Sequence, residues 1–142
     1  MLDDDGRMFL DALGVREGDA RLSAAVELVG GDYDTEIFDD PEATYLVMDD
    51  RGVDFLLEDD VVVAVFVYGP GSANGAPYAR GSHVVQGLDF GASPGEARRV
   101  LGEPKRTGPT YLLYELEQRV LHLEFTSGTL TMFTLQLRDV AG

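Results

Sequence analysis

Two stretches of the chain decide its fold. Residues 44–68 read TYLVMDDRGVDFLLEDDVVVAVFVY, and residues 110–136 read TYLLYELEQRVLHLEFTSGTLTMFTLQ. Each begins with Thr-Tyr-Leu and continues as three apolar runs separated by two short polar turns. Phe55 and Leu123 lie 68 residues apart, as do Val65 and Phe133. This internal repetition predicts that the two stretches are copies of one structural unit.

The runs have the pattern of β-strands. Leu121, Leu123 and Phe125 alternate with polar or smaller residues, which is typical of a strand with one buried face. Two-residue hairpin turns are predicted at residues 127–128 and, in the first copy, at residues 59–60. The run Val61 to Tyr68 is apolar throughout, so it is predicted either to be covered on both faces or to present an apolar face to a partner.

A helix is predicted before each set of strands. Ser93-Pro94-Gly95-Glu96 has the form of a capping box, and Gly102 and Pro104 end that helix. Its counterpart runs from Asp19 to Val29, and an additional N-terminal helix is expected from Arg7 to Leu13. We interpret the acid-rich segment from Asp32 to Glu42 as a loop, and the Gly- and Pro-rich segment 69–87 as a connector that is either functional or mobile.

The sequence therefore predicts an α+β protein made of two tandem helix-plus-three-strand antiparallel units. Residues 1–68 form the first unit with its extra helix, residues 69–87 connect the two, and residues 88–142 form the second unit. The expected core side chains are apolar residues on the predicted inner faces. They are Phe9, Leu13, Val26, Leu46, Phe55, Leu57, Val65, Val100, Leu112, Leu121, Leu123, Phe125, Phe133 and Leu135.

Composition limits the possible functions. The 142 residues carry a net charge of −15, and residues 1–80 hold 19 acidic but only 5 basic side chains. Binding to nucleic acid or to an anionic membrane is not expected, because both need Lys and Arg, whereas a cationic protein partner is favoured. The absence of cysteine excludes disulfides and thiolate metal sites and fits a reducing cytoplasm. The N-terminus has neither the basic flank nor the apolar stretch of a signal peptide.

No catalytic, metal or cofactor motif is predicted. Residues 32–36 resemble the start of a calcium loop, but Ile37 and Ala43 stand where such a loop needs Gly and Glu. The Gly-rich segment 69–75 is not followed by the Gly-Lys-Ser/Thr of a phosphate-binding loop. Of the two histidines, His122 lies on a predicted strand, opposite its apolar face, and is expected to face the surface or a partner.

The sequence instead predicts a partner-binding surface of acidic and aromatic residues. Alternation turns Tyr45 and Tyr111 to the face opposite the core, where they either meet a partner or pack under a second layer. Acidic side chains precede the first strand and occupy its hairpin. The predicted partner-binding residues are Asp32, Asp34, Glu36, Asp39, Asp40, Glu42, Tyr45, Asp49, Asp50, Tyr111 and His122.

Residues 87–104, GLDFGASPGEARRVLGEP, resemble the helix-and-turn signature of small bacterial immunity-type proteins associated with polymorphic toxins and bacteriocins. Residues 114–116 and 121–125 continue the likeness, and so do residues 51–57 and 65–68. The tandem layout is distantly similar to the β-lactamase inhibitor protein, in which two halves form a concave binding face. Its half-unit also resembles the small lipoprotein of the outer-membrane β-barrel assembly machine.

The resemblance implies a non-enzymatic inhibitor that neutralises a cognate toxin by covering its active site. The acidic charge favours a basic target, with nucleases as attractive examples. The alternative is a housekeeping interaction or assembly module, or a homodimer, with no inhibitory role; the protein itself is expected to be a monomer or a homodimer. In that alternative the apolar run from Val61 to Val67 makes the contact.

Overall fold

The computed structural model describes residues 1–39, 42–72 and 75–137. Its helices are α1 (Asp4–Ala12), α2 (Ala20–Val29), α3 (Pro94–Leu101) and the short 3₁₀ helix η1 (Gly81–His83). Its strands are β1 (Asp34–Asp39), β2 (Glu42–Met48), β3 (Val53–Glu58), β4 (Val61–Tyr68), β5 (Arg106–Thr107), β6 (Tyr111–Leu116), β7 (Arg119–Thr126) and β8 (Thr129–Gln136).

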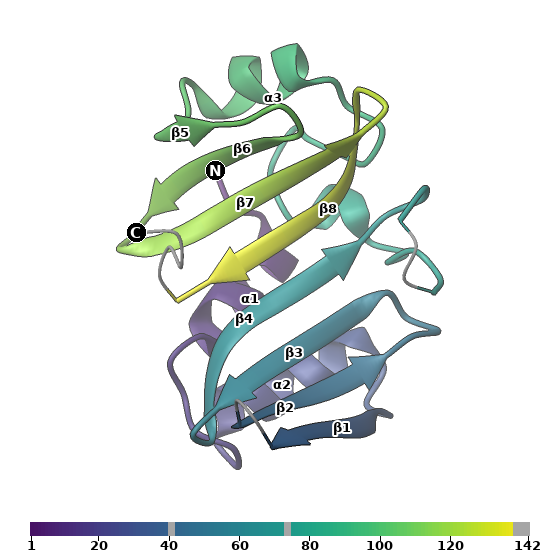
Figure 1. Cartoon of the computed structure of the whole chain (residues 1–142), viewed down its shortest axis with the longest axis vertical. Helices are drawn as coiled ribbons and strands as arrows, with labels where there is room; N and C mark the ends of the chain where they lie inside the picture. The colour runs from purple at the N-terminus through teal and green to yellow at the C-terminus, as the bar shows by residue number, and fades with distance from the viewer. Residues whose placement is uncertain (40–41, 73–74, 138–142) are drawn as a thin grey trace.

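Within the described residues, eight strands form one antiparallel sheet in the order β1-β2-β3-β4-β8-β7-β6-β5 (Figure 1). The predicted α+β class and antiparallel pairing are confirmed. The predicted number of strands is wrong, because each half of the sheet contains an additional outer strand, β1 or β5. The domain boundaries at residues 68 and 88 stay a prediction.

Strand β1 corrects the prediction that Asp32 to Glu42 is a loop. All six residues of β1 are exposed, and the strand pairs along its whole length with β2. Acidic residues are uncommon inside sheets, but at an edge they stay solvated and discourage pairing with other chains. The acidic segment is therefore an edge strand of the sheet and not the predicted loop.

The two halves of the sheet meet at strands β4 and β8, which we call the seam. Ala64 to Tyr68 pair with Met132 to Gln136. The ladder is extended at both ends: Gly69 N–H donates to the Thr131 carbonyl at 2.7 Å, and Leu137 N–H donates to the Val63 carbonyl at 2.9 Å. The seam makes the sheet continuous from one half to the other.

Each central strand also contains a bulge. The register shifts beside Leu56 and beside Glu124 leave Val63 and Thr131 as the extra residues. Next to each bulge, a segment that precedes a helix is hydrogen-bonded to the strand: Val62 exchanges bonds with residues 14–15, and Leu130 with residues 91–92. Each bulge therefore lies where the segment that precedes α2 or α3 is hydrogen-bonded to the sheet.

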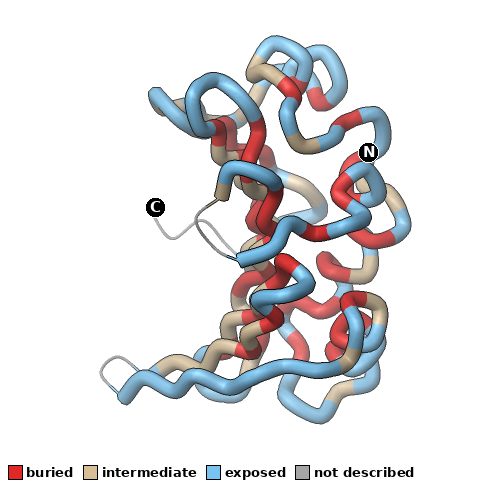
Figure 2. Tube along the Cα trace, turned by 90° about the vertical axis from the view of Figure 1, so that its right-hand side faces the viewer, coloured by how far each residue is buried: buried red, intermediate tan, exposed pale blue. Residues whose placement is uncertain are grey.

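The hydrophobic core lies between the sheet and the helices, which cover one face only (Figures 1 and 2). Thirteen of the fourteen predicted core residues are buried. The exception is Val100, which is 40% exposed. Helix α3 has only eight residues and buries just Ala97 and Leu101, so its apolar stripe is too narrow to include Val100.

Local signals placed the turns and caps well. The predicted capping box is present: Glu96 N–H donates to Ser93 Oγ at 3.1 Å, and Ser93 N–H donates to Glu96 Oε1 at 3.3 Å. The predicted hairpin turns have positive φ at Asp59 (52°) and Ser127 (54°), as two-residue turns of this kind require. The N-terminal helix runs from Asp4 to Ala12, three residues earlier than predicted at its start.

The described part of the connector packs against the core. Tyr78, Val84 and Val85 are buried, and Val84 accepts a hydrogen bond from Asp3 N–H at 3.0 Å. Asp5, at the start of α1, is 1% exposed and pairs with Arg80. Periodicity gave no sign of this packing, because the buried connector residues follow neither a helical nor a strand spacing. Among the described residues, no helix has both the length and the apolar character needed to cross a membrane.

Candidate functional site

The side of the sheet opposite the helices, which we call the open face, is covered by no helix in the described part of the chain. Seen edge-on, the backbone of the sheet curves so that its outer ends reach further from the helices than its centre (Figure 2). Alternation and strand register assign the residues of this face. From β1 across to β6 they include Asp34, Glu36, Phe38, Tyr45, Val47, Asp54, Leu56, Phe66, Tyr68, Met132, Thr134, His122, Glu124, Tyr111 and Leu113.

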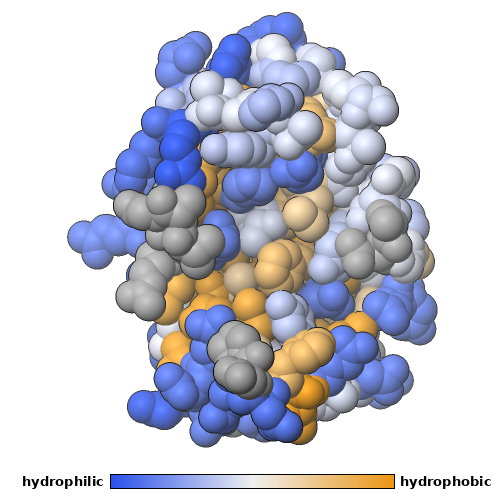
Figure 3. Space-filling model, in the orientation of Figure 1, coloured by the Kyte–Doolittle hydropathy of each residue, from blue (hydrophilic) through white to orange (hydrophobic). Residues whose placement is uncertain are grey.

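Apolar and aromatic side chains form a strip on this face. In Figure 3 they gather over the central strands and toward β1 and β2, with hydrophilic residues on both flanks. The rings of Phe38 and Tyr45 meet edge to face at 5.7 Å, and those of Tyr45 and Phe66 lie 6.4 Å apart. Phe66 and Tyr68 are nearly parallel, 6.5 Å apart. Phe38 is 50% exposed, so the strip reaches solvent at the edge of the sheet.

Asp54 lies within this aromatic strip, on β3. It pairs across the strands with Val47 and Phe66, and it accepts hydrogen bonds from the Tyr68 hydroxyl at 3.0 Å and from Met48 N–H at 3.3 Å. Burial raises the pKa of Asp54 above its ordinary value; the two hydrogen bonds oppose this effect, and the negative charges of Asp49 and Glu36 add to it. The open face thus holds a desolvated carboxylate among like charges.

A second, smaller cluster lies in the other half of the open face. The rings of Tyr111 and His122 stack with centroids 5.0 Å apart and planes inclined by 22°. His122 Nε2 is 3.9 Å from Glu124 Oε2. Both clusters consist of aromatic rings beside carboxylates.

The predicted partner-binding residues are distributed over three places. Tyr45, Tyr111 and His122 are on the open face, as predicted, and so are Asp34 and Glu36. Asp39 and Glu42 pair with each other and point to the opposite side of the sheet, so the structure does not bring them to the open face. Asp32 precedes β1, and Asp49 and Asp50 lie in the turn after β2, while Asp40 falls outside the described residues.

Sequence reasoning did not single out Phe38, Asp54 or Leu56 for the open face. It included Phe66 and Tyr68 only as members of the apolar run 61–68. The signal was available for Asp54, because it stands between Val53 and Phe55, both fully buried, in a run with strict alternation. Phe66 and Tyr68 were hidden in an apolar run without visible alternation. In β4 both faces of the sheet carry apolar side chains, so periodicity could not separate them.

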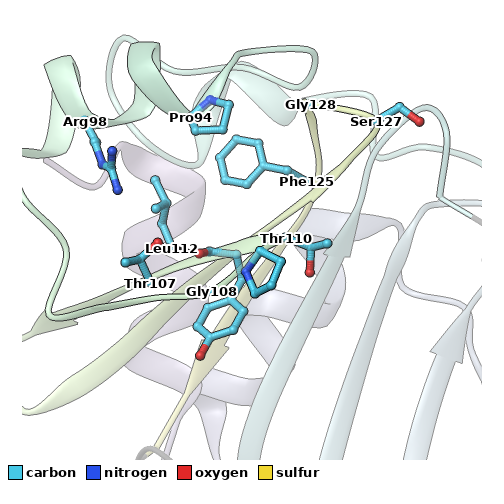
Figure 4. Close-up of a pocket in the computed structure, with 11 residues that line it drawn as sticks. Pro94, Arg98, Thr107, Gly108, Thr110, Leu112, Phe125, Ser127 and Gly128 are labelled. Carbon is cyan, nitrogen blue, oxygen red and sulfur yellow. Dashed lines mark hydrogen bonds between the residues drawn. The ribbon is translucent and has the colours of Figure 1, made fainter.

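A pocket of about 460 Å³ lies on the helix side of the sheet, beside α3 (Figure 4). Pro94 and Phe125 close one side of it, Arg98 reaches into it from α3, and Leu112 lies between them. Its lining includes the hydroxyl residues Thr107, Thr110 and Ser127, of which Ser127 points away from the cavity. Histidine and carboxylate side chains do not occur among the described residues that line it, so the pocket offers no obvious general base.

In the part of the chain that the structure describes, no three His, Asp or Glu side chains are grouped as metal ligands. The acidic residues of β1 are spread over both faces of an edge strand, and this dispersal keeps their carboxylates from converging.

Comparison with known proteins places the chain in no established family. No protein-family model matches it, and no curated protein matches it. Among solved structures, a DUF4309 family protein (YjgB) from Bacillus subtilis is similar, with 21% sequence identity and a TM-score of 0.44. That match covers 85% of this chain and 77% of the other chain.

Proposed function

We propose that this protein is a non-catalytic, protein-binding inhibitor of the immunity type, which covers a basic surface of its target with the open face. The observation that carries the proposal is a sheet face that no helix covers in the described part of the chain and on which aromatic rings and carboxylates are interleaved. Aromatic anchors surrounded by polar groups are the usual energetic centres of protein interfaces. The inhibitory role is supported by the resemblance of residues 87–104 to immunity-type proteins.

Charge favours a basic target. The open face contributes Asp34, Glu36 and Asp54 in one half and Glu115 and Glu124 in the other, against one basic residue, Arg106, among the described strands. Asp49 lies in the turn beside it. Opposite charges speed the encounter of two proteins and fix their orientation. A cationic active-site cleft, such as that of a nuclease, would present the complementary potential. We place this interaction in the cytoplasm, since the chain has no cysteine.

The alternative is an interaction or assembly module without an inhibitory role. The centre of the open face favours it, because Leu56, Phe66 and Met132 lie there and would make contacts that are insensitive to salt. A homodimer through the same face is one form of this alternative. Salt dependence separates the two candidates.

We further infer that the two halves arose by duplication of one helix-and-strand unit. The offset of 68 residues between Val63 and Thr131 recurs between Gly69 and Leu137, and these four residues make the two matching seam hydrogen bonds. Duplication would give a partner-binding face with two related clusters, one around Tyr45 and one around Tyr111.

The proposal is tested with a photo-crosslinking amino acid placed at Tyr45, and separately at Asp11 on the helix side as a control. Both proteins are exposed to host lysate at low salt, and the crosslinked peptides are identified by mass spectrometry. We expect one basic protein to crosslink from Tyr45 only, with a yield that falls as the salt concentration during irradiation is raised. We also expect that protein to lose its activity when it is bound. Crosslinks from Asp11 alone, or a captured protein that stays fully active, would contradict the proposal.

A further inference from the structure

The arrangement of rings and carboxylates around β3 defines a more specific partner chemistry. Tyr45 on β2 and Phe66 on β4 stand on either side of β3, and their rings meet at 6.4 Å with planes inclined by 30°. Asp54 lies between their strands as the direct cross-strand partner of Phe66. Glu36 is the direct cross-strand partner of Tyr45. Each ring of the pair therefore has a carboxylate beside it.

The charges at this place are unbalanced. Asp54 is half-buried, and the charged groups that act on it, Asp49 and Glu36, are both negative. Its hydrogen bonds come from the Tyr68 hydroxyl and Met48 N–H, two neutral donors. A carboxylate has room for about four hydrogen bonds, so Asp54 retains acceptor capacity for a charged donor. A positive group that arrives here would relieve the repulsion among the three carboxylates.

Arginine fits this place better than other cations. Its guanidinium group is planar, stacks on aromatic faces and donates hydrogen bonds to two acceptors at once. It is also more weakly hydrated than the ammonium group of lysine, so it loses less on entering a half-buried site. A metal ion would find rings where it needs oxygen ligands.

We propose that Tyr45 and Phe66, flanked by Glu36 and Asp54, form a subsite for one arginine side chain of the partner protein. The guanidinium group stacks on the rings and bonds to the carboxylates on either side. This inference rests on the proposed function, since it names the chemical group through which a basic target is recognised. Arginine residues of this kind are frequent energetic centres of interfaces.

The test needs no knowledge of the target. The whole protein is titrated with three capped tripeptides, Gly-Arg-Gly, Gly-Lys-Gly and Gly-citrulline-Gly, and the aromatic resonances of Tyr45 and Phe66 are followed by NMR. Citrulline has the shape of arginine without its charge, and lysine has the charge without the planar group. We expect the arginine peptide to shift both ring resonances with a Kd on the order of 1–10 mM, and the other two to bind at least about fivefold more weakly.

Two variants complete the test. Asp54→Asn preserves the size of the side chain: its amide oxygen can accept from Met48 N–H, and its NH₂ group can donate to the Tyr68 hydroxyl oxygen. The variant should weaken binding of the arginine peptide about five- to tenfold, because a charge-assisted hydrogen bond becomes a neutral one. Glu27→Gln makes the same charge change on the exposed side of α2 and should leave binding unchanged. Equal binding of arginine and citrulline peptides, or an unaffected Asp54→Asn variant, would overturn the subsite.

The outcome is distinguishable from that of the proposed function. If Tyr45 crosslinks to a basic protein but the arginine peptide shows no preference, the subsite is wrong and the binding face stands. If the arginine peptide binds as expected but no protein is inhibited, the subsite stands and the inhibitory role is wrong.

Discussion

The pairing of Asp5 with the connector yields the sharpest stability prediction. Asp5 is 1% exposed and accepts hydrogen bonds from the Tyr78 hydroxyl at 2.7 Å and from Arg80 Nε and Nη2 at 2.7 and 3.0 Å. Asp5→Ala removes all three bonds and leaves the buried Tyr78 hydroxyl without this acceptor. Because the Arg80 side chain is 47% exposed, solvent screens its ion pair with Asp5 and reduces what the pair contributes to stability.

The expected loss follows from the remaining contacts. A hydrogen bond to a charged group contributes about 1.5–3 kcal/mol, and leaving a buried donor unsatisfied costs about 1–3 kcal/mol. Both ranges include part of the cost of the lost Tyr78 hydrogen bond, so they are not simply added. We expect Asp5→Ala to lower the free energy of unfolding by about 3 kcal/mol. Tyr78→Phe, which removes one hydrogen bond to the Asp5 carboxylate, should cost about 1.5–3 kcal/mol. The measurement is urea unfolding followed by far-ultraviolet circular dichroism, with Asp11→Ala as the exposed control on the same helix.

The pH dependence gives a second readout of the same contact. Burial pushes the pKa of Asp5 upward, but hydrogen bonds from Arg80 and Tyr78 and the charge of Arg80 outweigh it, so the pKa is lowered. The resulting stability is present above the unfolded pKa of about 4 and is lost as pH falls through the folded value. In Arg80→Met, the effect of burial on the pKa of Asp5 is no longer outweighed, so the pKa should rise. The difference in free energy of unfolding between this variant and the wild type should then be larger at pH 7 than at pH 3.5.

The reasoning fails if Asp5→Ala costs less than about 1 kcal/mol or no more than Asp11→Ala. It also fails if the gap between Arg80→Met and the wild type is the same at both pH values. Either result would mean that the connector is held to α1 by apolar packing around Tyr78, with no contribution from the buried carboxylate.

Three further predictions concern the open face and its turn. Asp54→Asn should raise the free energy of unfolding at pH 7. The pKa of Asp54 is raised in the folded state, so the protonated side chain stabilises the fold at low pH and this stabilisation is lost as pH rises. Thermal melts should therefore show a smaller difference between variant and wild type at pH 4 than at pH 7. Replacing Asp34, Glu36 and Asp49 by their amides should slow association with a captured target and flatten its salt dependence in surface plasmon resonance, whereas Asp11→Asn with Glu27→Gln should do neither. Gly52→Ala should cost at least about 2 kcal/mol in chemical unfolding, because φ is +77° there and an added Cβ would lie 2.4 Å from Tyr78 N; a loss under 0.5 kcal/mol would contradict this.

Much of the fold could be predicted because its signals are local. The alternation around Leu123, the capping box at Ser93 and the two-residue turns at Asp59 and Ser127 are each encoded within a few residues. The seam between β4 and β8 could not be predicted in this way, because no local sequence signal indicates which strands that are distant in the chain will pair. Helix α3 shows the limit of periodicity, because Val100 has the correct spacing for the core but the short helix does not bury it.

The candidate site was predicted in part for a similar reason. Alternation placed Tyr45, Tyr111 and His122 correctly on the face opposite the core. The acidic residues were grouped by their closeness in sequence, and the strand formed by residues 34–39 then divided them between two faces. Asp54 lies on β3, and the sheet register places it beside Val47 and Phe66. The sequence alone does not give this register.

The seam also has a consequence for folding. Among the described strands, every pairing joins neighbours in the chain except that of β4 with β8, whose paired residues are more than sixty positions apart. Hairpins between neighbouring strands form within microseconds, whereas closing so long a loop is slow and costs chain entropy. The open face extends across the seam, so we expect it to be completed only when this slow pairing forms. A newly made chain could then form both meanders and still lack the complete binding face until β4 meets β8.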